Sequence, residues 1–70
     1  MFITVNGKAE SISPEPSPPN LSNVIKALGH NPLRVVVEFN GNILPPSLWE
    51  EQQVKTGDNL EVVTIVGGGS

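Results

Sequence analysis

Apolar and polar residues alternate from Ile3 to Asn6, and a second strand-like segment follows a turn, which together predict a β-hairpin. Residues 2–6 are rich in strand-forming residues, and residues 8–12 can return beside them. Asn6 and Gly7 lie between the two segments and suit a type I′ turn, because both central residues of that turn need a positive φ. The expected inward residues of the hairpin are Ile3, Val5 and Ile12.

The apolar spacing then changes from that of a strand to that of a helix. Residues 13–19 hold four of the seven prolines, which exclude both a helix and a central strand from this connection. The next apolar residues recur at offsets of 0, 3, 4 and 7, so they share one face of a helix. They are Leu21, Val24, Ile25 and Leu28. Asn20 is the expected N-cap and Gly29 the expected left-handed residue at the C-terminus of this helix.

The second half of the chain predicts two longer strands and a short one. Residues 34–40 form the strongest predicted strand, and its centre is apolar at the consecutive positions 35–37, as is typical of a strand that is covered on both sides or lies centrally. A second Asn-Gly pair ends this strand, residues 43–44 form a short strand, and residues 47–51 resemble a single helical turn with Trp49 over the edge of the core. In the last strand, residues 60–66, we expect Leu60 and Val62 on one face and Val63 and Ile65 on the other.

One helix and one sheet, each with a single good apolar face, bury those faces most simply against each other. The expected fold is therefore α+β: a β-grasp (ubiquitin-like) domain with a mixed sheet of four to five strands packed on one helix. The chain has 70 residues, well below the usual ~100–200 residues per domain, so one domain is expected. It comprises residues 1–66, and residues 67–70 form a flexible, glycine-rich C-terminal tail.

Composition and charge exclude several functions. Four basic residues stand against seven acidic ones, for a net charge of −3, and the basic residues are scattered, which argues against nucleic-acid binding and favours a partner with a basic docking surface. There is one histidine, His30, and no cysteine, so no metal site and no catalytic centre of its own are expected. We expect a cytoplasmic protein that binds no membrane, since no long apolar run and no signal-peptide pattern is present.

The glycine tail is the one segment that suggests chemistry. Three glycines contribute no burial, and each loses much backbone entropy on ordering, so they are poor fold elements. An arm without side chains can enter a narrow channel of another protein and present its terminal carboxylate to ATP. Attack on the α-phosphorus would give an acyl-adenylate, from which a sulfur nucleophile could displace AMP to leave a thiocarboxylate. The alternative is an inert end or linker, and the tail alone does not decide between the two.

The whole ordered pattern resembles the ThiS/MoaD family of sulfur carriers, and within it the ThiS group. The resemblance covers essentially all of the chain. It rests on residues 3–7 (ITVNG), residues 35–41 (VVVEFNG), Trp49, and the last strand that leads into glycines. Family members differ at two points: their glycine normally ends the chain, whereas Ser70 follows here, and many have arginine where this chain has Pro46.

The resemblance implies a carrier, not an enzyme, with the sulfur atom on Gly69 and Gly68 before it, after removal of Ser70. The implied partners are an E1-like adenylating enzyme (ThiF-like), a thiazole synthase (ThiG-like) and a cysteine desulfurase or related sulfur donor. No cofactor is bound, and ATP is consumed by the adenylating partner. We expect the docking surface beside the tail to contain Val63, Ile65, Val66 and Gly67. Two alternatives stay open: sulfur delivery for molybdopterin synthesis, and a noncovalent β-grasp interaction module.

Overall fold

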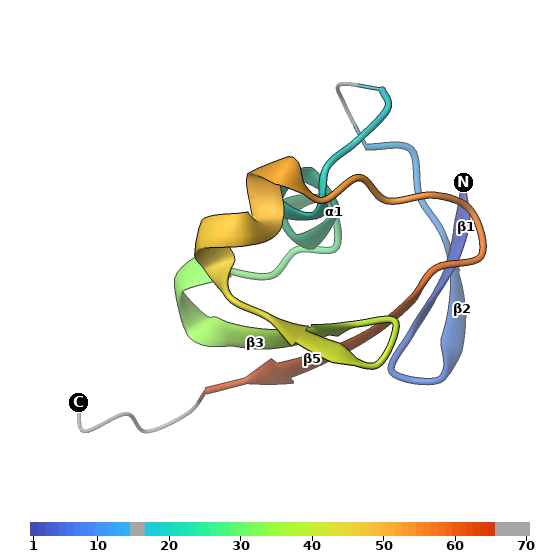
Figure 1. Ribbon diagram of the computed structural model, residues 1–70. Helices are drawn as coiled ribbons and strands as arrows, with labels where there is room; N and C mark the ends of the chain where they lie inside the picture. Colours follow the sequence, from blue (N-terminus) through green and yellow to red (C-terminus); the bar gives the residue numbers. More distant parts are fainter. Residues whose placement is uncertain (15–16, 66–70) are drawn as a thin grey trace.

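The computed structural model describes residues 1–14 and 17–65. A five-stranded mixed sheet has the strand order β2-β1-β5-β3-β4, with the helix α1 across one side of it (Figure 1). The elements in chain order are β1 Phe2–Val5, β2 Lys8–Ser11, α1 Leu21–Ala27, η1 Pro32–Arg34, β3 Val35–Phe39, β4 Asn42–Leu44, η2 Pro46–Glu51 and β5 Asn59–Thr64. This arrangement confirms the predicted β-grasp and settles the number of strands at five.

Both Asn-Gly pairs form the predicted tight turns. The φ angle is 52° at Asn6 and 79° at Gly7, and it is 51° at Asn40 and 90° at Gly41. Positive φ at both central residues matches the right-handed twist of the flanking strands, which pair antiparallel in each hairpin. The sequence therefore determines both hairpin registers locally.

The helix α1 begins at the predicted cap. The Asn23 amide donates to the Asn20 side-chain oxygen at 2.8 Å, and the Asn20 amide donates to the Asn23 side-chain oxygen at 3.2 Å. The helix ends at Ala27, with Leu28 half-buried as its C-cap and Gly29 at a φ of 88°. Such a short helix depends on the sheet that receives its apolar face.

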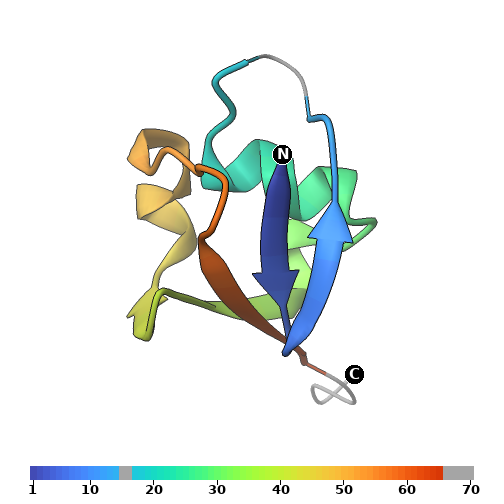
Figure 2. The same cartoon turned by 90° about the vertical axis from the view of Figure 1, so that its right-hand side faces the viewer.

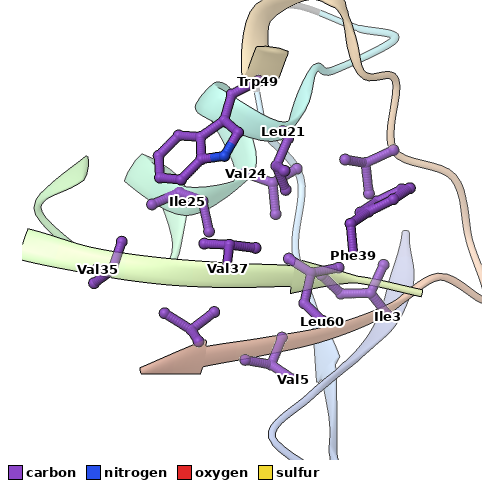
Figure 3. Packing of buried hydrophobic residues seen from close by; sticks show 12 residues of the cluster. Ile3, Val5, Leu21, Val24, Ile25, Val35, Val37, Phe39, Trp49 and Leu60 are labelled. Atoms are coloured by element: carbon purple, nitrogen blue, oxygen red, sulfur yellow. The ribbon is translucent and has the colours of Figure 1, made fainter. Parts of the chain in front are cut away.

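The core fills the space between α1, η2 and the facing side of the sheet (Figure 3). The prediction that Trp49 packs over the edge of the core was wrong, because its side chain is only 2% exposed and lies beside α1. Its indole nitrogen donates to the Leu44 carbonyl oxygen at 2.8 Å, which allows the polar end of the ring to be buried. The buried set is Ile3, Val5, Leu21, Val24, Ile25, Val35, Val37, Phe39, Trp49, Val54, Leu60 and Val62.

The strand β3 was predicted to be covered on both sides or to lie centrally, and the structure confirms the second alternative. Among the described residues the helices cover only one side of the sheet, so Val35 and Val37 are buried while Val36 between them is 41% exposed (Figures 1 and 2). β3 does lie inside the sheet, between β5 and β4, but it is not covered on both sides. The run of valines therefore supplies one exposed apolar residue.

The last strand β5 ends at Thr64, two residues before its predicted end. The predicted domain boundary after residue 66 and the predicted tail at residues 67–70 lie outside the described residues. Within the described part of the chain, no helix has the length and apolar character needed to cross a membrane.

Candidate functional site

The strand β5 positions the start of the C-terminal segment. It pairs antiparallel with β3, from Phe39 opposite Leu60 to Val35 opposite Thr64. The Ile65 amide donates to the Arg34 carbonyl oxygen at 2.7 Å, so the pairing continues one residue beyond β5. Leu60 and Val62 are buried and anchor the strand in the core. The described residues up to Ile65 are thus attached directly to the centre of the sheet.

The predicted alternation along β5 is confirmed. Leu60 is fully buried and Val62 is 6% exposed, whereas Val63 is 62% and Ile65 is 48% exposed. We call the side of the sheet that faces away from α1 the outer face; Val63 lies on it, and Ile65 continues the alternation. The other two predicted docking residues, Val66 and Gly67, lie outside the described residues.

The structure adds two apolar residues to the outer face that the sequence analysis missed. Val36 lies directly opposite Val63 in the register of β3 and β5, and Ile43 lies opposite Glu38 on β4, with 67% of its side chain exposed. The consecutive valines left two alternatives open, coverage on both sides or a central position, so they did not assign Val36 to an exposed face. The outer face therefore carries three exposed apolar side chains from the strands, and Ile65 continues it after β5: Val36, Ile43, Val63 and Ile65.

The predicted carrier residues Gly68 and Gly69, together with Ser70, lie outside the described residues. Their assignment stays a prediction that rests on the sequence. The described part of the chain does define what precedes them: a strand held on both edges, with an exposed apolar surface on one side.

Within residues 1–14 and 17–65, no group of three or more His, Cys, Asp or Glu side chains could hold a metal ion. His30 is half-buried after the helix, where its amide donates to the Ile25 carbonyl oxygen. An open cavity of about 240 Å³ lies near the N-terminus and is lined by Met1, Ile12, Ser13, Pro14, Ser17 and Pro19.

The fold, in which the central strand β5 has an exposed outer face and precedes a glycine-rich end, defines a ubiquitin-like β-grasp protein. A crystal structure of thiamine biosynthesis protein ThiS from Geobacter metallireducens superimposes with a TM-score of 0.79 at 33% sequence identity, covering 99% of this chain and 100% of that one. The ThiS family model matches residues 3–69. The chain belongs to the ThiS family, and this membership supports a sulfur-carrier role.

Two curated relatives add to this picture. The uncharacterized protein ycf40 of Pyropia yezoensis is 39% identical over 67 residues, which are 96% of this chain and 90% of that protein. A thiazole synthase of Paramagnetospirillum magneticum is 33% identical over all 70 residues, but these make up only 21% of its length. A region similar to this whole chain therefore forms part of a longer thiazole synthase polypeptide.

Proposed function

We propose that this chain carries sulfur as a thiocarboxylate on Gly69 and donates it for thiazole formation in thiamine biosynthesis. One observation carries the choice of pathway: a thiazole synthase contains, within one polypeptide, a region similar to the whole of this chain. Two functions that share a polypeptide in one organism commonly act together. The family match that extends to residue 69 supports Gly69 as the carrier residue.

The proposed chemistry begins at a free α-carboxylate on Gly69, so whatever follows that residue, Ser70 included, is removed first. A carboxylate oxygen attacks the α-phosphorus of ATP on an adenylating partner, and pyrophosphate leaves. A persulfide, supplied through a cysteine desulfurase or related donor, then attacks the acyl carbon through its outer sulfur and AMP leaves. A thiol next reduces the resulting acyl disulfide and is itself oxidised to a disulfide. The product is a thiocarboxylate, whose sulfur passes to the thiazole synthase.

The carrier contributes shape and attachment, not catalytic groups. Gly67 and Gly68 have no side chains and can pass through a narrow channel that leads to the ATP site of the partner. Val63, Ile65, Val66 and Gly67 belong to the proposed docking surface beside this arm. The exposure of Val63 and Ile65 supports this assignment, because exposed apolar residues that adjoin one another favour protein–protein contact.

The test uses three versions of the chain, which end at Gly68, Gly69 and Ser70. Each is mixed with the ThiF-like enzyme of the same cell and ATP, and pyrophosphate release and the mass of the acyl-adenylate are measured. We expect the product only from the version that ends at Gly69. An equal yield from the version that ends at Ser70 would exclude Gly69 as the carrier residue.

A genetic experiment separates the proposed pathway from delivery of sulfur to molybdopterin. Deletion of the gene is expected to make the cell dependent on added thiamine or thiazole and to leave molybdoenzyme activity intact. The opposite phenotype would support molybdopterin synthesis. If the folded protein is not adenylated and the deletion produces neither phenotype, the noncovalent interaction module is the remaining alternative.

A further inference from the structure

The outer face carries an acidic pair next to its apolar residues. Glu38 on β3 lies directly opposite Glu61 on β5, one row of the sheet away from the pair formed by Val36 and Val63. Both glutamates point outward, because the residues on either side of each of them are buried: Val37 and Phe39 around Glu38, and Leu60 and Val62 around Glu61. Like charges directly across a strand pair destabilise a sheet.

In the register of the described strands, no basic residue lies directly beside this pair. On the row that contains Glu38 and Glu61, the next residue on β4 is Ile43, which is apolar. On the other side, the β1–β5 register ends with Val5 opposite Leu60, so the next position faces Asn6, which is uncharged. The basic residue that precedes β3 is Arg34 at the end of η1, four residues before Glu38 and therefore roughly 13 Å away at the usual strand rise.

The outer face is thus polarised along its strands. Arg34 lies at one end of this face, beside Ile65, which is the last described residue. Val36 and Val63 occupy the middle, and the acidic pair Glu38–Glu61 lies at the far end. A partner that receives the tail and covers this face meets the apolar residues first and the acidic pair farther from the tail.

We infer that the outer face binds the adenylating partner through an apolar surface and a basic side chain of that partner, which lies between Glu38 and Glu61. The inference rests on the proposed function and adds to it the residues that orient the docking. Two adjacent carboxylates repel phosphate groups, which excludes nucleic acid and an anionic membrane as the occupant. A second copy of this chain carries the same excess of negative charge, with a net charge of −3, so charge complementarity favours a partner with a basic group.

The pair has opposite effects in the free carrier and in the complex. In the free carrier the two carboxylates repel each other, and a bound basic side chain turns that repulsion into two charge-assisted contacts. Removing the charges is therefore expected to stabilise the carrier and weaken its docking. A merely structural role would predict that stability and docking change in the same direction.

The experiment compares two double variants of the version that ends at Gly69. In Glu38→Gln/Glu61→Gln the outer face loses both charges, and the matched control Glu50→Gln/Glu51→Gln loses the same charge from η2 on the helix side of the sheet. Pyrophosphate release by the ThiF-like enzyme is measured against carrier concentration. We expect the outer-face variant to raise KM about tenfold with kcat unchanged, and the control to stay within about twofold of the parent.

Two further measurements complete the test. The increase in KM is expected to shrink in high salt, and the midpoint of urea unfolding of the outer-face variant is expected to equal or exceed that of the parent. An unchanged KM, or an equal increase in the control, would overturn the docking inference alone. If the parent releases no pyrophosphate, both the proposed function and the docking inference are overturned. Sedimentation that shows dimers lost only in Glu38→Gln/Glu61→Gln would overturn the inference by assigning the face to a second copy.

Discussion

The side chain of Asn6 pairs with both backbone groups of Val62. Its Nδ2 donates to the Val62 carbonyl oxygen at 3.2 Å, and its Oδ1 accepts from the Val62 amide at 2.7 Å. The parallel ladder between β1 and β5 extends only from Thr4 to Val5 on β1, because the chain turns away at Gly7. The side-chain amide of Asn6 therefore takes the place of a neighbouring strand's backbone and extends the pairing of β5 towards its C-terminal end.

We expect Asn6→Asp to destabilise the fold by about 1–2 kcal/mol, because it replaces the donor to the Val62 carbonyl with a second acceptor. Aspartate has nearly the same shape and also tolerates the positive φ of Asn6. Urea unfolding followed by circular dichroism measures the change. Asn42→Asp adds the same charge at an exposed position on β4 and serves as the control. Equal midpoints for the two variants would show that the Asn6 contact contributes nothing.

The left-handed conformation of Gly29 provides a second test. Its φ is 88°, and a methyl group built there meets no atom within 4 Å, so only the backbone conformation opposes a side chain. Gly29→Ala is expected to cost about 1 kcal/mol, and Gly29→Asn less, since asparagine visits this region more readily. The two variants are compared by urea unfolding at equal m-values. The same loss for both would contradict the conformational explanation.

The buried indole of Trp49 leads to a third prediction. Trp49→Phe removes the hydrogen bond to the Leu44 carbonyl oxygen and leaves part of the indole volume empty, so we expect a loss of about 1–3 kcal/mol. The measurement is urea unfolding followed by circular dichroism. The neighbouring Leu48→Thr changes an exposed side chain on η2 and is expected to stay within about 0.5 kcal/mol. A loss as small as that of the control would place Trp49 outside the stabilising core.

Much of this fold is readable from the sequence because its signals are local. The two Asn-Gly turns depend on the conformational freedom of the turn residues themselves, and the cap at Asn20 depends on a residue three positions away. The burial of Trp49 was not readable, since it depends on a carbonyl group presented by β4 and on the position of α1. Side-chain pairing across 56 residues, as between Asn6 and Val62, has no sequence period to reveal it.

In the candidate site, too, features that depend on one strand were predicted and features that depend on the pairing of two strands were not. Val63 and Ile65 were predicted because alternation along one strand assigns their face. The residues opposite Val36 and Glu38 could not be assigned, because these pairings depend on the register between β3 and β5, strands separated by some twenty residues. A sequence pattern indicates which face of a strand is apolar, but only the register indicates what lies across from it.

The last prediction concerns the outer face, where a substitution is expected to change adenylation but not the free energy of unfolding. Val63 is 62% exposed and its partner Val36 is 41% exposed, so Val63→Thr keeps a β-branched side chain on the strand and removes apolar contact area. We expect its unfolding free energy to change by less than about 0.5 kcal/mol. The efficiency of adenylation, kcat/KM for the version that ends at Gly69, is expected to fall about tenfold through KM, because a residue near the centre of an interface contributes most to binding.

The matched comparison is Leu48→Thr, which also replaces an exposed apolar residue but lies on η2, across the sheet from the outer face. Its adenylation efficiency is expected to equal that of the parent. Equal losses in Val63→Thr and Leu48→Thr would indicate a general effect of surface polarity, and no loss in either would remove Val63 from the docking surface. A selective loss at Val63 alone requires that the enzyme covers the outer face, because the two variants differ in the side of the sheet on which they lie.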